Sequence, residues 1–279
     1  MHRTTLSDLS KQYLLLRLVL LLSLIFFLIG LVALISRWGA TVPIIIFACL
    51  FRLVAVWLVQ RKYHASWMQA SATVAAEQKC GTVSYTARET VSGTLVTDLG
   101  LAPDVHIAPH TRLFHVLRGN QSGLPFRLAE TAFVRTDGTR KVAGSSPVAG
   151  SLITMENALP KDEKWVLLMN DPMNGFCPLK VYERSGWKQV FASSGTAVCF
   201  SENGIAGSAD AARTMLSRLL NQESAILAAS GGNLSLMLPG CFYACKADLS
   251  KAPTEEMLKQ TVIPALDIMQ KLTVAFRKH

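Results

Sequence analysis

The chain has 279 residues, of which 50% are hydrophobic, and a net charge of +9 at pH 7. This length accommodates a membrane segment followed by one folded domain, and the mean hydropathy of +0.31 is high for a fully soluble protein. A pI of about 9.4 is typical of proteins that bind nucleic acid. Most of the excess positive charge, however, precedes residue 63. The remainder has no long basic run and no RNA-binding motif, so the composition argues against nucleic-acid binding.

Residues 14–35 are the first predicted membrane span, preceded by a cytoplasmic tail over residues 1–13. The stretch 18–35 carries no charged residue and is long enough to cross a bilayer. It is also longer than the apolar region of a signal peptide, which has about 7–15 residues.

A second apolar helix is predicted over residues 42–59, after a short turn at 36–40. Pro43 suits the first turn of a helix, and Trp38 and Trp57 suit the two membrane interfaces. The length is close to the minimum for crossing. The sequence favours a transmembrane helical hairpin over residues 14–60, with a single span followed by a buried core helix as the alternative.

Basic residues flank the two ends of this hairpin, whereas the turn carries only Arg37. The flanking residues are Arg3, Lys11 and Arg17 before the first span and Arg61 and Lys62 after the second. Because positive charge accumulates on the cytoplasmic side, we expect both termini to be cytoplasmic and the protein to lie in the cell membrane (plasma or inner membrane).

Arg52 interrupts the second span. It precedes Arg61 by nine residues, or about 13 Å along a helix, and an arginine side chain extends part of that distance towards the headgroups. Arg17, Arg52, Arg61 and Lys62 are therefore candidate contacts for lipid phosphate. A partner helix or an anionic lipid bound between the spans is the alternative.

The remaining sequence predicts a juxtamembrane helix over residues 61–79 and a cytoplasmic α+β domain over 80–279. Residues 80–120 give no clear pattern, but from residue 125 apolar and polar residues alternate as in strands. The predicted strands are 126–134, 148–155, 165–169, 187–191, 196–201, 224–229 and 234–238. Asp137-Gly138 predicts a hairpin turn after the first of them.

Two helices are predicted late in the chain. Ser208 suits the N-cap of a helix ending near Asn221. A long C-terminal helix begins near Pro253, with acidic residues at its start and an apolar stripe from Leu258 to Phe276. Pro264 should kink or split it. The expected fold is thus membrane-anchored α+β, with a mostly antiparallel sheet and a long C-terminal helix.

The sequence contains no phosphate-binding loop, dinucleotide fingerprint, nucleophile elbow or HExxH pair, and no cofactor is predicted. Two weaker candidates contain metal-ligating residue types. Cys241 and Cys245 are separated by three residues, unlike the two common in zinc sites; a buried structural pair is favoured over a metal or redox site. His106, His110 and His115 lie within ten residues, and a metal site there competes with solvated loop histidines.

Glu130 is the third candidate. It falls in step with the apolar residues Phe126, Leu128, Ala132 and Val134 of a predicted strand, which indicates that its carboxylate faces inward. A buried carboxylate needs a partner. A structural ion pair with a nearby arginine is favoured over a catalytic acid.

Three segments, LPFRLAETAF, VAGSLI and TAVCFSENGIAGSADAARTMLSRLL, resemble a bacterial family of two-span membrane proteins, the family of domain of unknown function 3137. The shared features are the hairpin, a strand with a glutamate (Glu130), a strand with a glycine (Gly150) and a strand leading into the helix at Ser208. The resemblance implies two N-terminal spans and a cytoplasmic α+β domain. It implies no activity.

The sequence therefore favours a non-enzymatic, membrane-anchored cytoplasmic module. Such a module would dock a protein partner or a membrane complex, or associate with itself. The alternatives are a membrane-tethered enzyme, using metal at His106, His110 and His115, and a sensor of anionic lipids acting through the basic flanks of the hairpin.

Overall fold

The structure is a computed structural model, and it describes residues 4–35, 41–138, 140–170, 176–193, 197–205, 207–220, 223–242 and 247–276. The chain forms two compact units. The first comprises Met1–Ala75 and Ala244–Thr261, and the second comprises Ala76–Tyr243 and Val262–His279.

The first unit is built mainly from helices that run one after another. They are α1 (Leu6–Ile35), α2 (Thr41–Phe51), a π-helical turn η1 (Arg52–Val56), α3 (Trp57–Cys80) and the short α7 (Glu255–Lys259). The residues at both ends of η1, Phe51 and Trp57, keep α-helical dihedral angles. The chain therefore remains helical from Thr41 to Cys80.

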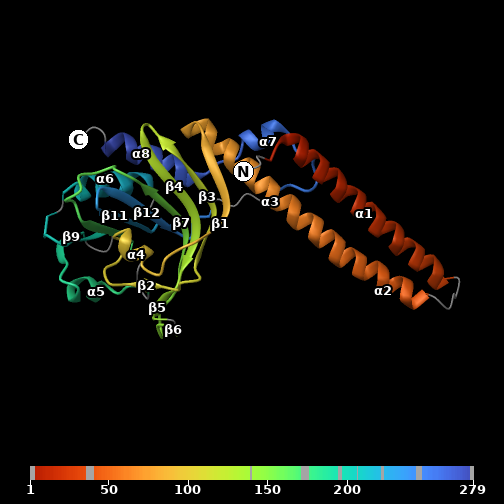
Figure 1. Cartoon of the computed structure of the whole chain (residues 1–279), viewed down its shortest axis with the longest axis horizontal. Coiled ribbons are helices and arrows are strands. Elements are labelled where there is room, and N and C mark those ends of the chain that lie inside the picture. Colours follow the sequence, from red (N-terminus) through yellow and green to blue (C-terminus); the bar gives the residue numbers. More distant parts are fainter. Residues whose placement is uncertain are drawn as a thin grey trace. The chain divides into compact units, whose positions relative to one another are not determined.

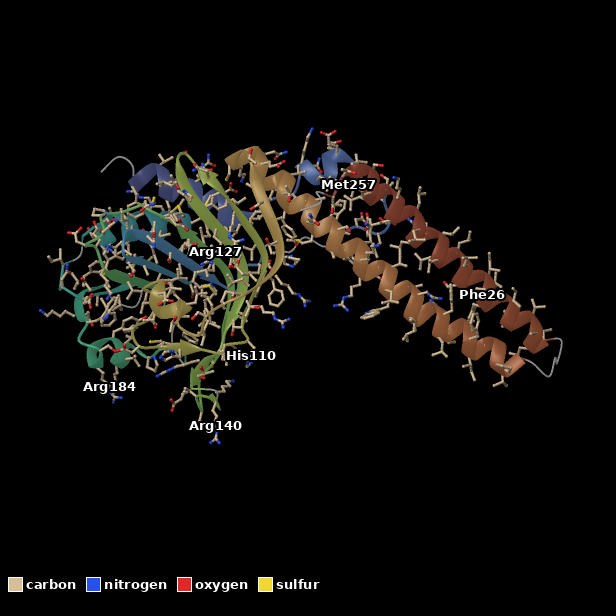
Figure 2. The ribbon with its side chains drawn as sticks, in the orientation of Figure 1. Phe26, His110, Arg127, Arg140, Arg184 and Met257 are labelled. Carbon is tan, nitrogen blue, oxygen red and sulfur yellow. The ribbon has the colours of Figure 1, made fainter. Side chains whose placement is uncertain are left out.

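Helix α1 packs along α2 and η1 through a line of small residues. Ser23, Gly30 and Ala33 are the buried positions on its apolar half, and Ala48 is buried on α2. Phe26 of α1 is labelled in Figure 2. Its ring lies 5.6 Å from that of Phe47 and 5.4 Å from that of Phe51, measured between ring centroids. Small residues allow two helix backbones to approach closely, as in helix pairs within membranes.

Away from the apolar half of α1, helices α1 and α3 enclose a small core with the segment Ala244–Thr261, which is called the returning segment below. Leu9, Tyr13 and Leu16 of α1 are buried there. Their neighbours are Tyr63, Trp67 and Ala70 of α3, and Ala247 and Leu258 of the returning segment. The Thr254 hydroxyl caps α7 by accepting a hydrogen bond from the backbone N–H of Met257 at 3.2 Å.

The second unit contains a nine-stranded sheet among the described residues, in the order β1-β3-β4-β7-β12-β11-β8-β10-β9 (Figure 1). Every neighbouring pair is antiparallel. The strands are β1 (Val83–Thr90), β3 (Arg112–Gln121), β4 (Leu124–Phe133), β7 (Val148–Met155), β8 (Trp165–Met169), β9 (Lys188–Ser193), β10 (Ala197–Ser201), β11 (Ala225–Ser230) and β12 (Asn233–Pro239).

Helices cover both faces of this sheet. On one face lie α6 (Ala209–Leu219) and α8 (Pro264–Phe276) (Figure 1), and Thr273 of α8 contacts the sulfur of Met155. On the other face, α4 (Leu95–Asp98) places Val96 in a buried cluster with Leu152. Met155 and Leu152 are three residues apart on β7, and an odd spacing along a strand puts side chains on opposite faces.

A smaller sheet follows the order β2-β5-β6. Its strands are β2 (His106–Ile107), β5 (Arg135–Asp137) and β6 (Arg140–Lys141), and the remaining helix is α5 (Leu179–Arg184). The pairing of Asp137 with Arg140 confirms the hairpin predicted at Asp137-Gly138.

The long apolar N-terminal helix and the mostly antiparallel α+β domain are as predicted, but three element boundaries differ. Helix α1 starts at Leu6, so residues 6–13 of the expected tail are helical. The C-terminal helix begins at Glu255 and not near Pro253, and it is split at Pro264, as predicted, into α7 and α8. Residues 83–90 and 112–121, where no pattern was recognised, are strands.

Among the described helices, α1 is the one long and apolar enough by itself to cross a membrane. Helix α2 has eleven residues, because the π-helical turn separates it from α3. The predicted turn residues Arg37 and Trp38 lie outside the described residues.

Candidate functional site

A group of polar side chains joins β1, β3 and β4 in the second unit. The Tyr85 hydroxyl on β1 and Nδ1 of His115 on β3 form a hydrogen bond of 2.7 Å. Glu130 on β4 pairs in register with Phe114 and Ser151 and is 8% exposed. Three ionisable groups from neighbouring strands therefore meet in a mostly buried region.

His115 owes its place in this group to a β-bulge. The pairing of β3 with β4 shifts by one residue between Phe114 and Leu117, and His115 has a left-handed φ of +52°. A histidine adopts this conformation only at some energetic cost, and bulges often re-aim a side chain. The bulge is the local reason that the imidazole meets Tyr85.

Burial dominates the titration of this group. Desolvation lowers the pKa of His115, with Glu130 acting in the opposite direction and Arg88 in the same direction. Desolvation and the Glu130 carboxylate together raise the pKa of Tyr85 to about 12. Neutral imidazole and neutral phenol are therefore the forms that the folded protein favours.

The polar region continues from Glu130 to its register neighbour Ser151 on β7, and from there to Cys241, which follows β12. Ser151 is fully buried, and its hydroxyl donates to the backbone carbonyl of Cys241 at 2.8 Å. Burial, followed by Glu223 and Glu130, raises the pKa of the Cys241 thiol. A protonated thiol is a poor nucleophile.

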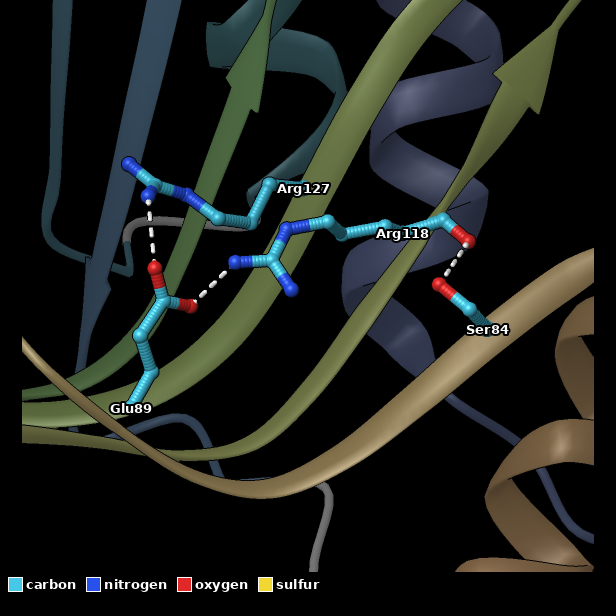
Figure 3. A network of polar contacts seen from close by, with 4 residues as sticks. All are labelled: Ser84, Glu89, Arg118 and Arg127. Atoms are coloured by element: carbon cyan, nitrogen blue, oxygen red, sulfur yellow. Dashed lines mark hydrogen bonds and ion pairs between the residues drawn. The ribbon is translucent and has the colours of Figure 1, made fainter. Parts of the chain in front are cut away.

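A second polar group involves the same three strands (Figure 3). Nη2 of Arg118 on β3 lies 2.5 Å from Oε2 of Glu89 on β1, and Nη1 of Arg127 on β4 lies 3.7 Å from Oε1 of that carboxylate. Arg127 and Glu130 are three residues apart on β4, so they point to opposite faces. Strand β1 is thus tied to the sheet on both faces by ionisable side chains.

The three histidines singled out in the sequence do not come together. His106 is exposed on β2, His110 is exposed in the turn before β3, and His115 is half-buried against Tyr85. Among the residues that the structure describes, no three histidine, cysteine or carboxylate side chains form a group that could hold a metal ion. The expectation of solvated loop histidines fits His110 but is wrong for His115.

The described cysteines are all free thiols. Cys177 and Cys199 are buried, as small apolar residues would be, while Cys49 is exposed on α2. Cys241 is half-buried just after β12, and Cys245 lies outside the described residues. The pairing predicted for Cys241 and Cys245 stays a prediction.

The basic residues of the first unit lie in two kinds of surroundings. Arg17 donates from Nε to the Tyr13 hydroxyl and from Nη2 to the Ser250 carbonyl, both at 2.8 Å, and Arg61 stacks on the Trp57 ring at 5.3 Å. Arg52, at the start of η1, is exposed, as is Lys62. Their predicted contacts with lipid phosphate or a partner helix stay predictions.

Sequence reasoning identified Glu130 and His115 but missed Tyr85, Glu89, Arg118 and Arg127. The alternation of VSYTARET, with Tyr85 between polar residues, was the available signal for β1. The cross-strand pairs themselves depend on register, which a single sequence does not display.

Comparison with known proteins gave no match: no family model, no curated protein and no solved structure matches this chain. The resemblance to the two-span family stays a prediction.

Proposed function

We propose that this chain is a non-enzymatic membrane-anchored module, with a two-span helical anchor and a cytoplasmic α+β domain that docks a protein partner. One observation carries the anchoring. Large apolar side chains cover the outside of the helix pair, from Leu14 to Ile35 on α1 and from Val42 to Leu58 on the following helices. An apolar surface of this extent is unusual on a soluble protein and suits lipid.

The two apolar surfaces have lengths that suit two spans. They cover 22 and 17 residues, about 33 and 26 Å along a helix, close to the roughly 30 Å hydrocarbon core of a bilayer. Tyr13 immediately precedes the first apolar surface and Tyr63 follows the second. Their rings are 6.0 Å apart, so both tyrosines mark the same end of the helix pair. The unbroken helix through η1 supports a second span although α2 alone is short.

The orientation rests on charge. Arg17, Arg61 and Lys62 gather at the end where Tyr13 and Tyr63 lie, and the positive-inside bias assigns that end to the cytoplasm. Arg61 stacked on Trp57 is an arrangement that suits the headgroup level. The same cluster gives some support to a second candidate function, binding of anionic lipid.

We assign the docking role to the outer edge of β1. Ser84, Ala87 and Arg88 are exposed along it. The backbone N–H of Val91 donates to Thr111 across the β1–β3 ladder, so by alternation the N–H groups of Arg88 and Thr90 point away from β3. Such an edge can pair with an extended segment of another protein.

The other edge strand is less suited to pairing. Strand β9 begins with Lys188, and its pairing with β10 shifts between Cys199 and Phe200. Lysine and bulges are common means of protecting a sheet edge.

Reporter fusions test the anchor. A phosphatase or fluorescent reporter at the N-terminus, and separately at the C-terminus, should report a cytoplasmic location for both ends. Opposite locations would leave a single span and refute the hairpin. A photocrosslinking residue at Ala87 should give a discrete product in native membranes, and one at the exposed Arg184 of α5 should not. Equal crosslinking from both positions would contradict docking at β1.

A further inference from the structure

A row of polar side chains crosses one face of the large sheet. The pairing registers place Ser84, Arg118, Arg127, Thr154 and Ser235 opposite one another on five consecutive strands, β1, β3, β4, β7 and β12. Neighbouring strands are about 4.8 Å apart. Two residues further along the same face, Ala129 and Leu152 are apolar and 1% exposed, so the polar row borders the apolar core on that side.

The two arginines of this row are direct cross-strand neighbours. Like charges opposite each other destabilise a sheet, and Glu89 compensates only in part. It approaches Arg118 to 2.5 Å but Arg127 only to 3.7 Å. Glu156, an exposed residue after β7, is the other acidic group that acts on Arg127.

Arg127 has unused hydrogen-bonding capacity. Its side chain is 23% exposed, and in the described part of the chain its guanidinium has the ion pair with Glu89 and no hydrogen-bond acceptor. A guanidinium carries five N–H donors, and buried charges are normally paired and hydrogen-bonded. Burial also lowers the pKa of Arg127, as expected for an incompletely paired cation.

Hydroxyl groups continue the row beyond Arg127. Thr154 is its register neighbour on β7 and is 6% exposed. Ser235 on β12 is fully buried, and its hydroxyl has no hydrogen-bond partner among the described residues. Two guanidinium groups and a hydroxyl thus lie at successive strand spacings, with a further unpartnered hydroxyl behind them.

We propose that Arg118, Arg127 and Thr154 form a binding site for a phosphate group, which Glu89 occupies in part when no ligand is bound. A tetrahedral oxyanion presents oxygens to donors on several sides, whereas a planar carboxylate is matched by one guanidinium fork. The ligand therefore displaces the Glu89 carboxylate from the arginines. The phosphate belongs either to a soluble small molecule or to a lipid headgroup, and the site does not depend on the proposed docking role of β1.

Titration of the full chain with inorganic phosphate tests the site. In phosphatidylcholine nanodiscs, isothermal titration should show saturable binding of phosphate and much weaker binding of acetate. Arg118→Gln should weaken phosphate binding on the order of tenfold, because a charge-assisted contact is lost. Arg112→Gln, at the other end of β3 and exposed, is the matched control and should bind like the parent protein.

Glu89→Gln separates a binding site from a purely structural ion-pair network. If the carboxylate competes with the ligand, its neutralisation should tighten phosphate binding on the order of tenfold, a gain that misfolding cannot produce. No phosphate binding by the parent protein, equal binding of acetate, or equal effects of Arg118→Gln and Arg112→Gln would overturn the proposal.

Nanodiscs that also contain phosphatidic acid identify the source of the phosphate. Loss of inorganic phosphate binding in those discs indicates a lipid headgroup, and unchanged binding indicates a soluble ligand. Neither result bears on the topology of the anchor, which the reporter fusions test separately.

Discussion

The carboxylate of Glu163 holds the start of helix α6 in place. Its Oε2 accepts hydrogen bonds from the Ser208 backbone N–H at 3.2 Å, the Ser208 hydroxyl at 2.6 Å and Nε1 of Trp165 at 2.8 Å. The sequence predicted Ser208 as the N-cap, and it occupies that position, but its hydroxyl donates to Glu163 instead of accepting from the helix. A negative charge at a helix N-terminus is also favourable.

Glu163→Ala should lower the free energy of unfolding by about 1–3 kcal/mol, because it leaves buried donors without an acceptor. Denaturant unfolding followed by tryptophan fluorescence measures the change. Glu202→Ala is the control, since Glu202 forms a surface ion pair with Lys164, and such a pair contributes less than about 1 kcal/mol. Equal losses from the two substitutions would show that Glu163 has no capping role.

His115 should make stability depend on pH. Its pKa is lowered in the folded protein, so between that lowered value and the unfolded value of about 6.5 the unfolded state binds more protons. Stability should therefore be constant above pH 7 and fall as the pH decreases below about 6.5. Melting temperatures between pH 5 and 8 measure this, and His115→Gln should flatten the slope.

His110→Gln is the control for this measurement, because His110 is exposed. If the pH dependence of stability persists in His115→Gln but disappears in His110→Gln, then His110 and not His115 causes it.

At the residue scale, local alternation in the sequence predicted the orientation of single side chains but not their contacts across strands. Glu130 lies in step with apolar neighbours, and its predicted inward orientation is confirmed by its burial. Tyr85 could not be linked to His115, because their contact depends on a bulge and on pairing across 30 residues. The two arginines were likewise unremarkable in sequence, since only register makes them neighbours.

Among the elements, strands β7 and β12 are in contact so close that only glycine fits at position 150. A Cβ on Gly150 would lie 2.0 Å from the Leu238 carbonyl oxygen, far inside van der Waals contact. Gly150→Ala should therefore separate two central strands and lower the free energy of unfolding by more than about 3 kcal/mol, measured by denaturant unfolding.

Gly138→Ala provides the comparison for Gly150. Gly138 has a left-handed φ of +59°, but a Cβ added there would meet no described atom within 4 Å, so only backbone strain of about 1 kcal/mol is expected. If Gly150→Ala and Gly138→Ala lowered the free energy of unfolding equally, the close approach of β7 and β12 would not be the reason that position 150 requires glycine.

Strand prediction succeeded where both alternation and turn residues were present. Predicted strands 148–155 and 165–169 coincide with β7 and β8. It failed over β1, where the alternation of Val83, Tyr85 and Ala87 is short, and over β3, where the bulge at His115 breaks the alternation. The predicted apolar stripe from Leu258 to Phe276 fails at Val262, which is 63% exposed because the helix is broken there, whereas Met269 and Leu272 of the stripe are buried.

At the scale of the whole molecule, the chain crosses between its two units more than once. The first unit takes its helices from the N-terminal part and then recruits the segment Ala244–Thr261. A boundary at residue 80, as the sequence suggested, separates the helices from the sheet but overlooks this return. Composition could not show it, because the returning segment contributes only a few apolar residues to a core made by α1 and α3.

The returning segment should stabilise the first unit without stabilising the second. Leu258 is 4% exposed in the core with Leu9, Tyr63 and Trp67, and Leu258→Asp places an unpaired charge there. We expect a loss of about 3 kcal/mol, or roughly 100-fold less protection from hydrogen exchange, in residues 5–20 and 60–75. Protection of β7, β8, β11 and β12 should not change. The control is Gln260→Asp, which is close by in sequence and exposed, and it should change the protection of neither unit. If Leu258→Asp instead lowered protection equally in the sheet, the two units would unfold together.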